Sequence, residues 1–411
     1  MGSTLRGPNG QSPSGRIPAR APERVWRADP SSGGLIVAEN ENTDSPVRTS
    51  RDDSVLREKL QSWLGIQLPA DAAPEVSEIS SPSESGMSSE TLLFEATWKG
   101  KAGFREGGAF VGRMAPSQED HPIFPAYDLE MQARVMRLAA KSGVPVPSVR
   151  WLELDENVLG AAFFIMDRIA GRVPADVPTY SIEGFVKDAS PQERRRLQDN
   201  TVSSIAKIHA IDLEANDGSF LEFPVEGKTA LARHVANQRA YYEWAIPDRP
   251  SPLIERAFEH LEESWPNETS RVVSWGDSRI GNVMYGNDGF EPVAILDWEM
   301  AGLGTRELDL GWLSFMHTFF QKLFEGMGMD GLPDFLRADD LAETYQKMSG
   351  HSVEDLRWYE TYAALRHAII MSRISDRMIH FGQAEPTEDP DDRIPHRATL
   401  EGMLDGSFWH D

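Results

Sequence analysis

The spacing of hydrophobic residues changes along the chain and separates a tail from two structured regions. Residues 1–50 are rich in Gly, Pro, Ser and Arg, and their few apolar residues follow no period. Such a segment buries too little apolar surface to offset the entropy of ordering, so we predict a disordered tail. A helix capped by Asp53 or Ser54 is predicted next, because one apolar stripe follows: Leu56, Leu60, Trp63 and Leu64.

The pattern of β-strands then replaces the helical stripe, up to about residue 166. The runs "TLLFEATW" (91–98) and "GAFVGRM" (108–114) flank a glycine-rich connection, which predicts a hairpin. A helix and two further strands follow, at 127–143, 149–155 and 160–171. We therefore predict a small sheet that carries one helix.

After residue 171 the chain is mostly helical. Helices are predicted at 194–212, 229–245, 252–263, 307–325, 338–348 and 353–378, with strands only within 271–298. The predicted fold class is α+β, a two-lobe protein-kinase-like arrangement with a small β-rich lobe and a larger helical lobe. We expect the first lobe, with its N-terminal helix, to span 51–168 and the second to span 169–411.

Composition narrows the possible partners. The 411 residues carry a net charge of −24, which disfavours nucleic acids and anionic membranes as partners. The chain has no cysteine, which excludes disulfides and a thiol nucleophile. With neither a secretory signal nor an apolar run long enough to span a membrane, we expect a cytoplasmic protein.

One hairpin gathers polar side chains within "SWGDSRIGNVMYGNDGFEPVAILDW" (274–298). The β-type runs "VMY" and "PVAIL" flank "GNDG", a strong turn signal. Pairing these runs brings Asn282 and Asp297 to the same open end, and Asp277 lies on the loop that enters the first strand. Mg²⁺ prefers hard oxygen ligands of this kind. A further carboxylate beside an incoming hydroxyl suits phosphoryl transfer, where positioning and charge stabilisation dominate.

This spacing resembles the catalytic segment of the aminoglycoside phosphotransferase family, which has a protein-kinase-like and choline-kinase-like fold. The likeness extends over residues 70–380 and is strongest at 271–313. It implies ATP, or GTP, as the phosphate donor, Mg²⁺ as the metal and a small-molecule hydroxyl as the acceptor. Aminoglycosides, and hence antibiotic resistance, are the favoured case. The same fold phosphorylates choline, amino-alcohols, sugars and hydroxyacyl thioesters, which stay open as alternatives.

The resemblance also implies roles for single residues. Asp277 would be the catalytic residue, and Asn282 and Asp297 would hold the metal. Three parts of the chain would contact the nucleotide: the loop in "SGMSSETLLFEA", a positively charged side chain on a strand, and the backbone of a hinge in "FFIMDRIAG". The residues are Gly86 and Ser88 of the loop, Arg113 of the strand, and Asp167 and Ile169 of the hinge.

The chain departs from the family pattern at three points. Trp275 stands where the family has a histidine that braces the loop, and its indole could fill that space and donate one N–H. Arg113 replaces a lysine and keeps the positive charge with a different reach. Either Glu130 or Gln132 could occupy the place of the helical glutamate that pairs with this cation.

Other residues of the segment favour structural roles. We predict Asp309 to brace the catalytic region and three residues to pack in the core: His209, Trp298 and Trp312. Two functions without catalysis are weighed beside the kinase. A nucleotide-binding module in which Trp275 marks decay would bind ATP without transferring phosphate, and a scaffold protein would not bind the nucleotide.

Overall fold

The computed structural model describes residues 25–28, 35–38, 51–80, 89–100, 103–176 and 178–410. Strands β1 (Val25–Ala28) and β2 (Leu35–Ala38) form an antiparallel pair in a unit of their own, residues 1–45. They lie within the predicted tail, and the rest of residues 1–50 is outside the described residues. All other elements belong to the unit 46–411.

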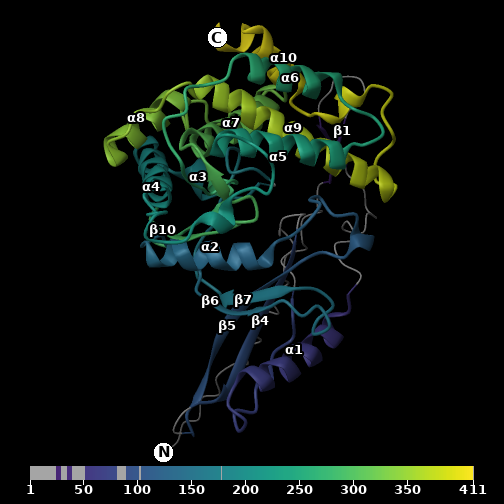
Figure 1. Ribbon diagram of the computed structural model, residues 1–411, viewed down its shortest axis with the longest axis vertical. Helices are drawn as coiled ribbons and strands as arrows, with labels where there is room; N and C mark the ends of the chain where they lie inside the picture. The colour runs from purple at the N-terminus through teal and green to yellow at the C-terminus, as the bar shows by residue number, and fades with distance from the viewer. Residues whose placement is uncertain are drawn as a thin grey trace, which may run out of the picture. The chain divides into compact units, whose positions relative to one another are not determined.

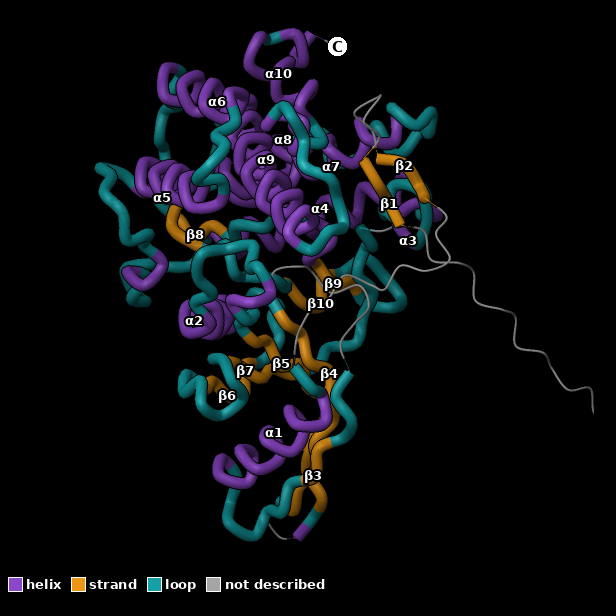
Figure 2. The backbone as a smooth tube through the Cα atoms, turned by 90° about the vertical axis from the view of Figure 1, so that its right-hand side faces the viewer, coloured by secondary structure: helices purple, strands orange, loops and turns teal. Residues whose placement is uncertain are grey.

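A five-stranded sheet in the order β3-β4-β5-β7-β6 forms the first part of this unit (Figures 1 and 2). Its strands are β3 (Glu75–Val76), β4 (Glu90–Lys99), β5 (Arg105–Met114), β6 (Val149–Glu153) and β7 (Phe163–Asp167). Helix α1 (Asp53–Gln67) precedes the sheet, and α2 (Leu129–Lys141) lies between β5 and β6. The cap of α1 is Asp52, so the prediction of Asp53 or Ser54 was wrong: the Asp52 carboxylate accepts from the backbone N–H groups of Ser54 and Val55.

Strand β7, which lies between β5 and β6, is apolar because both of its faces are buried. Phe163 and Ile165 pack with the apolar stripe of α1, whereas Phe164 and Met166 pack with α2. Successive side chains of a strand point to opposite faces, so two helices on one sheet require this continuous apolar run.

The second part of the unit is helical and contains two core clusters. Its helices are α3 (Phe185–Asp188), α4 (Pro191–His209), α5 (Ala230–Ala245), α6 (Pro252–Glu263), α7 (Glu307–Glu325), α8 (Ala338–Ser349), α9 (Leu356–His380) and α10 (Arg397–Asp405). One-turn 3₁₀ segments lie at Gln118–Asp120, Ser219–Leu221, Ile280–Asn282, Pro390–Arg393 and Ser407–His410. Helices α5, α6, α7 and α9 share one core, and α4 and α8 pack beside the other.

Four short strands position the connections that carry the candidate site. They are β8 (Val272–Ser274), β9 (Val283–Tyr285), β10 (Pro292–Ile295) and β11 (Gly302–Gly304). Strand β8 pairs with β11 and β9 with β10, both antiparallel. The segments that join the two pairs, 275–282 and 296–301, must therefore run between the same two points.

Candidate active site

The two connections are bound to each other through Trp275. Its indole nitrogen donates to the carbonyl oxygens of Leu296 at 2.9 Å and Asp297 at 3.2 Å. The backbone N–H of Leu296 donates to the Asn282 carbonyl at 2.9 Å. The predicted indole brace is thus present, and it fixes the backbone at the position from which the Asp297 side chain projects.

Three donors hold the carboxylate of Asp277. Trp312 on α7 donates its indole N–H to Oδ1 at 2.7 Å. Asn282 donates its amide to Oδ2 at 2.6 Å, and the Nε of Arg279 lies 3.3 Å from the same oxygen. The side chain of Asp277 is 16 % exposed, so the carboxylate is both held and reachable.

Asp297 has a different environment. Its backbone is in the left-handed region, with φ of 56°. Its side chain is 19 % exposed, and Oδ1 lies 3.6 Å from an Arg113 nitrogen without accepting a hydrogen bond from any described residue. Burial raises the pKa of Asp297 and the Asp277 carboxylate adds to this, while Arg113 and Arg279 oppose it.

Asp297 and Asn282 carry oxygen donors that fit a magnesium ion. An orphaned carboxylate oxygen is the hard donor that Mg²⁺ takes up, and a dication would remove the cost of the buried charge. Asn282 is only 6 % exposed and uses its amide nitrogen on Asp277, which leaves its amide oxygen as the second donor. The backbone hydrogen bond from Leu296 to Asn282 brings Asn282 and Asp297, the residue after Leu296, to the same end of the hairpin, as the sequence predicted.

Asp309 binds the start of the segment that carries Asp277 through both of its carboxylate oxygens. Its Oδ1 accepts from the Ser274 hydroxyl at 2.9 Å and the Gly276 N–H at 3.0 Å. Its Oδ2 accepts from the Trp275 N–H at 2.8 Å and lies 2.9 Å from Nε2 of His209. Burial opposes ionisation, but these bonds outweigh it and lower the pKa of Asp309. A bracing role was predicted for Asp309, and its contacts are those of a brace.

Arg113 extends from β5 toward Asp297. It donates to the Thr91 hydroxyl at 3.0 Å and approaches Asp297. Of the two α2 residues considered as its partner, Gln132 is buried and Glu130 is exposed. The carboxylate that Arg113 meets is Asp297 and not Glu130 of the helix.

The remaining predicted nucleotide contacts lie at the end of β7 and in the loop before β4. The N–H of Asp167 donates to the Ser148 carbonyl at 3.1 Å, and the contact of its backbone with an adenine stays a prediction. Ile169 is half-buried in the segment that follows the strand. Gly86 and Ser88 are outside the described residues, and their predicted contacts with phosphates stay predictions.

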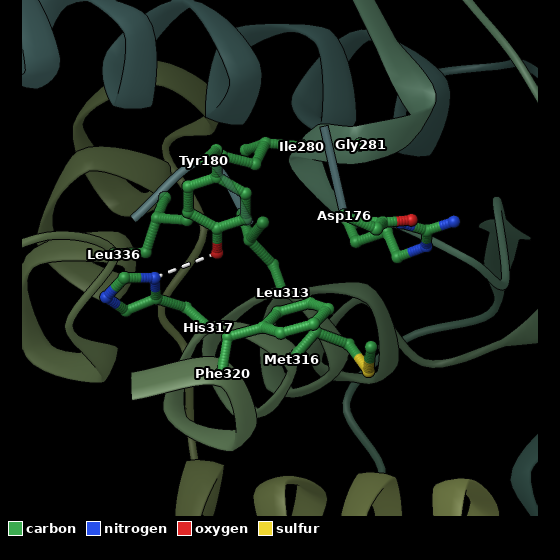
Figure 3. A pocket seen from close by; sticks show the side chains of 10 residues that line it. Asp176, Tyr180, Ile280, Gly281, Leu313, Met316, His317, Phe320 and Leu336 are labelled. Atoms are coloured by element: carbon green, nitrogen blue, oxygen red, sulfur yellow. Dashed lines mark hydrogen bonds and ion pairs between the residues drawn. The ribbon is translucent and has the colours of Figure 1, made fainter. Parts of the chain in front are cut away.

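A small pocket is lined in part by Arg279 and Asp176, and Figure 3 shows it from close by. Its volume is about 10 Å³, close to the minimum that holds one water. The wall is largely apolar, with Leu313, Met316 and Phe320 from α7. Its one carboxylate, Asp176, accepts two contacts of 2.7 and 2.6 Å from Arg279, whose charge these bonds and Asp277 stabilise against burial.

Sequence reasoning missed Arg279, Arg366 and the second role of Trp312. Arg366 is buried on α9 and donates to the Gly276 carbonyl at 3.0 Å. Trp312 is buried as predicted, yet its indole also reaches the catalytic loop. The position of Arg279, two residues after Asp277, was the one available signal, whereas the other two contacts join residues 35 and 90 positions apart.

Comparison with known proteins identifies the family. The family model described as "Phosphotransferase enzyme family" matches residues 104–350, more than half of the chain. The chain belongs to this family.

The curated relatives are longer proteins that carry acyl-CoA dehydrogenase names. Mouse acyl-CoA dehydrogenase family member 10 is 27 % identical over 187 residues, 46 % of this chain and 16 % of that protein. The probable acyl-CoA dehydrogenase IBR3 of Arabidopsis thaliana is 25 % identical over 276 residues, 62 % of this chain and 32 % of that protein. The chain therefore matches a third or less of the length of these relatives.

Solved structures share the fold. A candidate aminoglycoside phosphotransferase from Ralstonia eutropha superposes with a TM-score of 0.60 at 23 % identity, covering 84 % of this chain and 96 % of that one. A thermostable mutant of aminoglycoside phosphotransferase APH(4)-Ia, solved with AMP-PNP and hygromycin B, gives 0.51 at 15 % identity, covering 85 % and 99 %. The predicted α+β, kinase-like fold class is confirmed. Within the described residues, no helix is long and apolar enough to cross a membrane.

Proposed function

We propose that this protein is an ATP- and Mg²⁺-dependent O-phosphotransferase that acts on a hydroxyl of a small molecule. The observation that carries the proposal is the pairing of a held carboxylate, Asp277, with an orphaned one, Asp297, on two connections joined by Trp275. Asp277 suits a group that accepts a hydrogen bond from a hydroxyl, and Asp297 suits a group that binds a cation.

The proposed roles follow the lobes of the kinase-like fold. Residues 51–168 would bind the nucleotide and residues 169–411 would carry the catalytic loop and the acceptor. The hinge would contact adenine through Asp167 and Ile169, and the loop with Gly86 and Ser88 would contact phosphates. GTP is the alternative donor.

The metal and the strand cation would act on the phosphates. Asn282 and Asp297 would hold Mg²⁺, which when bound neutralises phosphate charge. Arg113 lies close enough to Asp297 to hold a phosphate oxygen of the same nucleotide.

The acceptor hydroxyl would be aligned by Asp277. The oxygen of the acceptor hydroxyl forms the new bond to the γ-phosphorus while the bond from phosphorus to the ADP oxygen breaks. The hydroxyl proton passes to the Asp277 carboxylate. An aspartate is a weak base for an alcohol, but late proton transfer to a positioned carboxylate suits a loose transition state.

Two acceptor classes are proposed, and specific observations favour different ones. The fold and the net charge of −24 favour a polycationic aminoglycoside. The names of the curated relatives favour a hydroxyacyl thioester.

The test is magnesium-dependent ATP consumption across a panel of aminoglycosides, choline and amino-alcohols, sugars and hydroxyacyl thioesters, with Asp277→Asn as the blank. Turnover with one class, absent in the variant, is the expected result. ATP binding without turnover on any acceptor would favour the non-catalytic module, and absence of ATP binding would refute the kinase assignment.

A further inference from the structure

Trp312 places an N–H group directly on the proposed catalytic carboxylate. The 2.7 Å contact between its indole nitrogen and Oδ1 of Asp277 has the length of a charge-assisted hydrogen bond. Trp312 is only 2 % exposed, so water does not compete for the indole. The bond joins α7 to the loop between β8 and β9.

The other contacts of Asp277 decide which oxygen can serve an acceptor. Each oxygen of an ionised carboxylate offers about two acceptor positions. Those of Oδ2 are taken, by Asn282 at 2.6 Å and Arg279 at 3.3 Å. Across the described residues Oδ1 has the indole as its donor, which leaves one position open. An incoming hydroxyl would therefore meet the oxygen that Trp312 already orients.

Arg366 holds the indole and the loop together. Its guanidinium carbon lies 4.3 Å from the centroid of the Trp312 ring. Its Nη2 donates to the carbonyl of Gly276, the residue before Asp277, at 3.0 Å. One buried side chain of α9 thus fixes both the backbone that leads to Asp277 and the ring that binds its carboxylate.

We propose that Trp312 is a positioning residue for phosphoryl transfer. Its indole holds Asp277 in the orientation in which Oδ1 accepts the hydroxyl, and the proton passes to that oxygen as the bond to phosphorus forms and the bond to ADP breaks. Trp312 itself exchanges no proton. The inference rests on the proposed function, but the bond on which it depends can be tested without an acceptor.

The first test observes the bond in the whole protein. With ¹⁵N-labelled tryptophan, Trp312→Phe identifies the indole N–H resonance of Trp312, and Asp277→Asn should move that resonance upfield because a neutral amide accepts more weakly than a carboxylate. The Trp358 indole, which donates to the Leu261 carbonyl at 3.1 Å, serves as the internal control and should not move. A Trp312 resonance that ignores Asp277→Asn overturns the proposal whatever the protein's reaction is.

The second test separates positioning from packing. Trp312→Phe should lower kcat about 10- to 100-fold, the range for a hydrogen bond to a charged group, and change the KM for ATP less than about threefold. Trp358→Phe removes the N–H of another buried tryptophan and should keep kcat within about threefold. An unchanged kcat in Trp312→Phe, or equal losses in the two variants, would contradict the role. If the wild-type protein phosphorylates no acceptor, the proposed function fails, while the resonance experiment still decides whether the bond exists.

Discussion

Asp309 and Asp297 both accept a hydrogen bond from Trp275, yet the surroundings of their carboxylates differ in the number of donors. The carboxylate of Asp309 has four hydrogen-bonding partners: two backbone N–H groups, one hydroxyl and one imidazole. Asp297 has an oxygen that accepts no hydrogen bond from the described residues and an arginine at 3.6 Å. The pKa of Asp309 is lowered, whereas burial raises that of Asp297.

This difference separates a structural carboxylate from one that needs a ligand. A buried carboxylate with all positions filled stabilises the fold in its ionised form. A buried carboxylate with an empty position costs stability until a cation arrives. Asp277, two residues after Trp275, is a third case, because its Oδ1 accepts one hydrogen bond and has room for one more group.

The largest effect is expected at Asp277. Asp277→Asn should reduce turnover by about 10²- to 10⁴-fold, because the amide cannot take up the hydroxyl proton. Nucleotide affinity, measured by calorimetry, should stay nearly the same. Asp288→Asn, on the exposed turn of the same hairpin, is the matched control and should turn over normally. Equal loss of binding and turnover in Asp277→Asn would count against the assigned role.

Opposite sensitivities of the free energy of unfolding are expected for Asp309 and Asp297. Asp309→Asn should lower the free energy of unfolding by about 3–5 kcal/mol in urea titrations, because the amide N–H₂ faces donors in a buried site. Asp297→Asn removes a charge that lacks a hydrogen bond and should change it by less than about 1 kcal/mol. If both variants lose the same stability, the distinction between them is wrong.

Glu360 on α9 is an intermediate case, since one oxygen accepts from the Ser314 hydroxyl at 2.7 Å. Burial raises its pKa to about 7. The unfolded chain ionises this group near pH 4.5, so its contribution to stability is complete below that pH and is lost as the pH rises to about 7. Glu360→Gln should be neutral at pH 5 and stabilise by on the order of 2 kcal/mol at pH 8. A variant with the pH dependence of the wild type would contradict this ionisation.

Trp275 tests the brace between the two connections. Trp275→Phe leaves the carbonyls of Leu296 and Asp297 without the indole donor and should cost about 1–3 kcal/mol of stability. Turnover should fall with it, because Asp297, the proposed metal ligand, loses its backbone support. Trp358→Phe is the control for the loss of a buried N–H, and a fall in its activity as large as that of Trp275→Phe would remove the special role of the brace.

Arg113→Lys is expected to have the smallest effect. Lysine keeps the charge but not the two-pronged reach, so the KM for ATP should rise a few-fold with little change in stability. Arg105→Lys, on the exposed part of the same strand, should leave the KM unchanged. A rise in KM in both variants would indicate a general charge effect.

Local signals predicted the elements well. Helix α6 begins at Pro252 after the Ser251 cap, and its predicted bounds are those observed. The hairpin that carries Asn282 followed from its turn residues, and the register confirms the pairing. The short helix α3 and the last helix α10 were not predicted, since four and nine residues give little periodicity.

The contacts that complete the site were beyond such signals. Trp312 reads as a core residue in any pattern of apolar spacing, and only the packing of α7 against the loop brings its indole to Asp277. Arg366 would be expected at the surface by composition, yet it is buried between that indole and a backbone carbonyl. Residue type and spacing predict which groups do chemistry, whereas the groups that hold them come from tertiary contacts.

The most direct test of the account is the effect of Mg²⁺ on the affinity for AMP-PNP, measured by calorimetry in the wild type and in Asp297→Asn. We predict that Mg²⁺ tightens binding in the wild type and that most of this gain disappears in the variant, because the orphaned oxygen is then lost as a metal ligand. The same gain in both proteins would contradict the assignment of Asp297 and, with it, the proposed phosphoryl-transfer site.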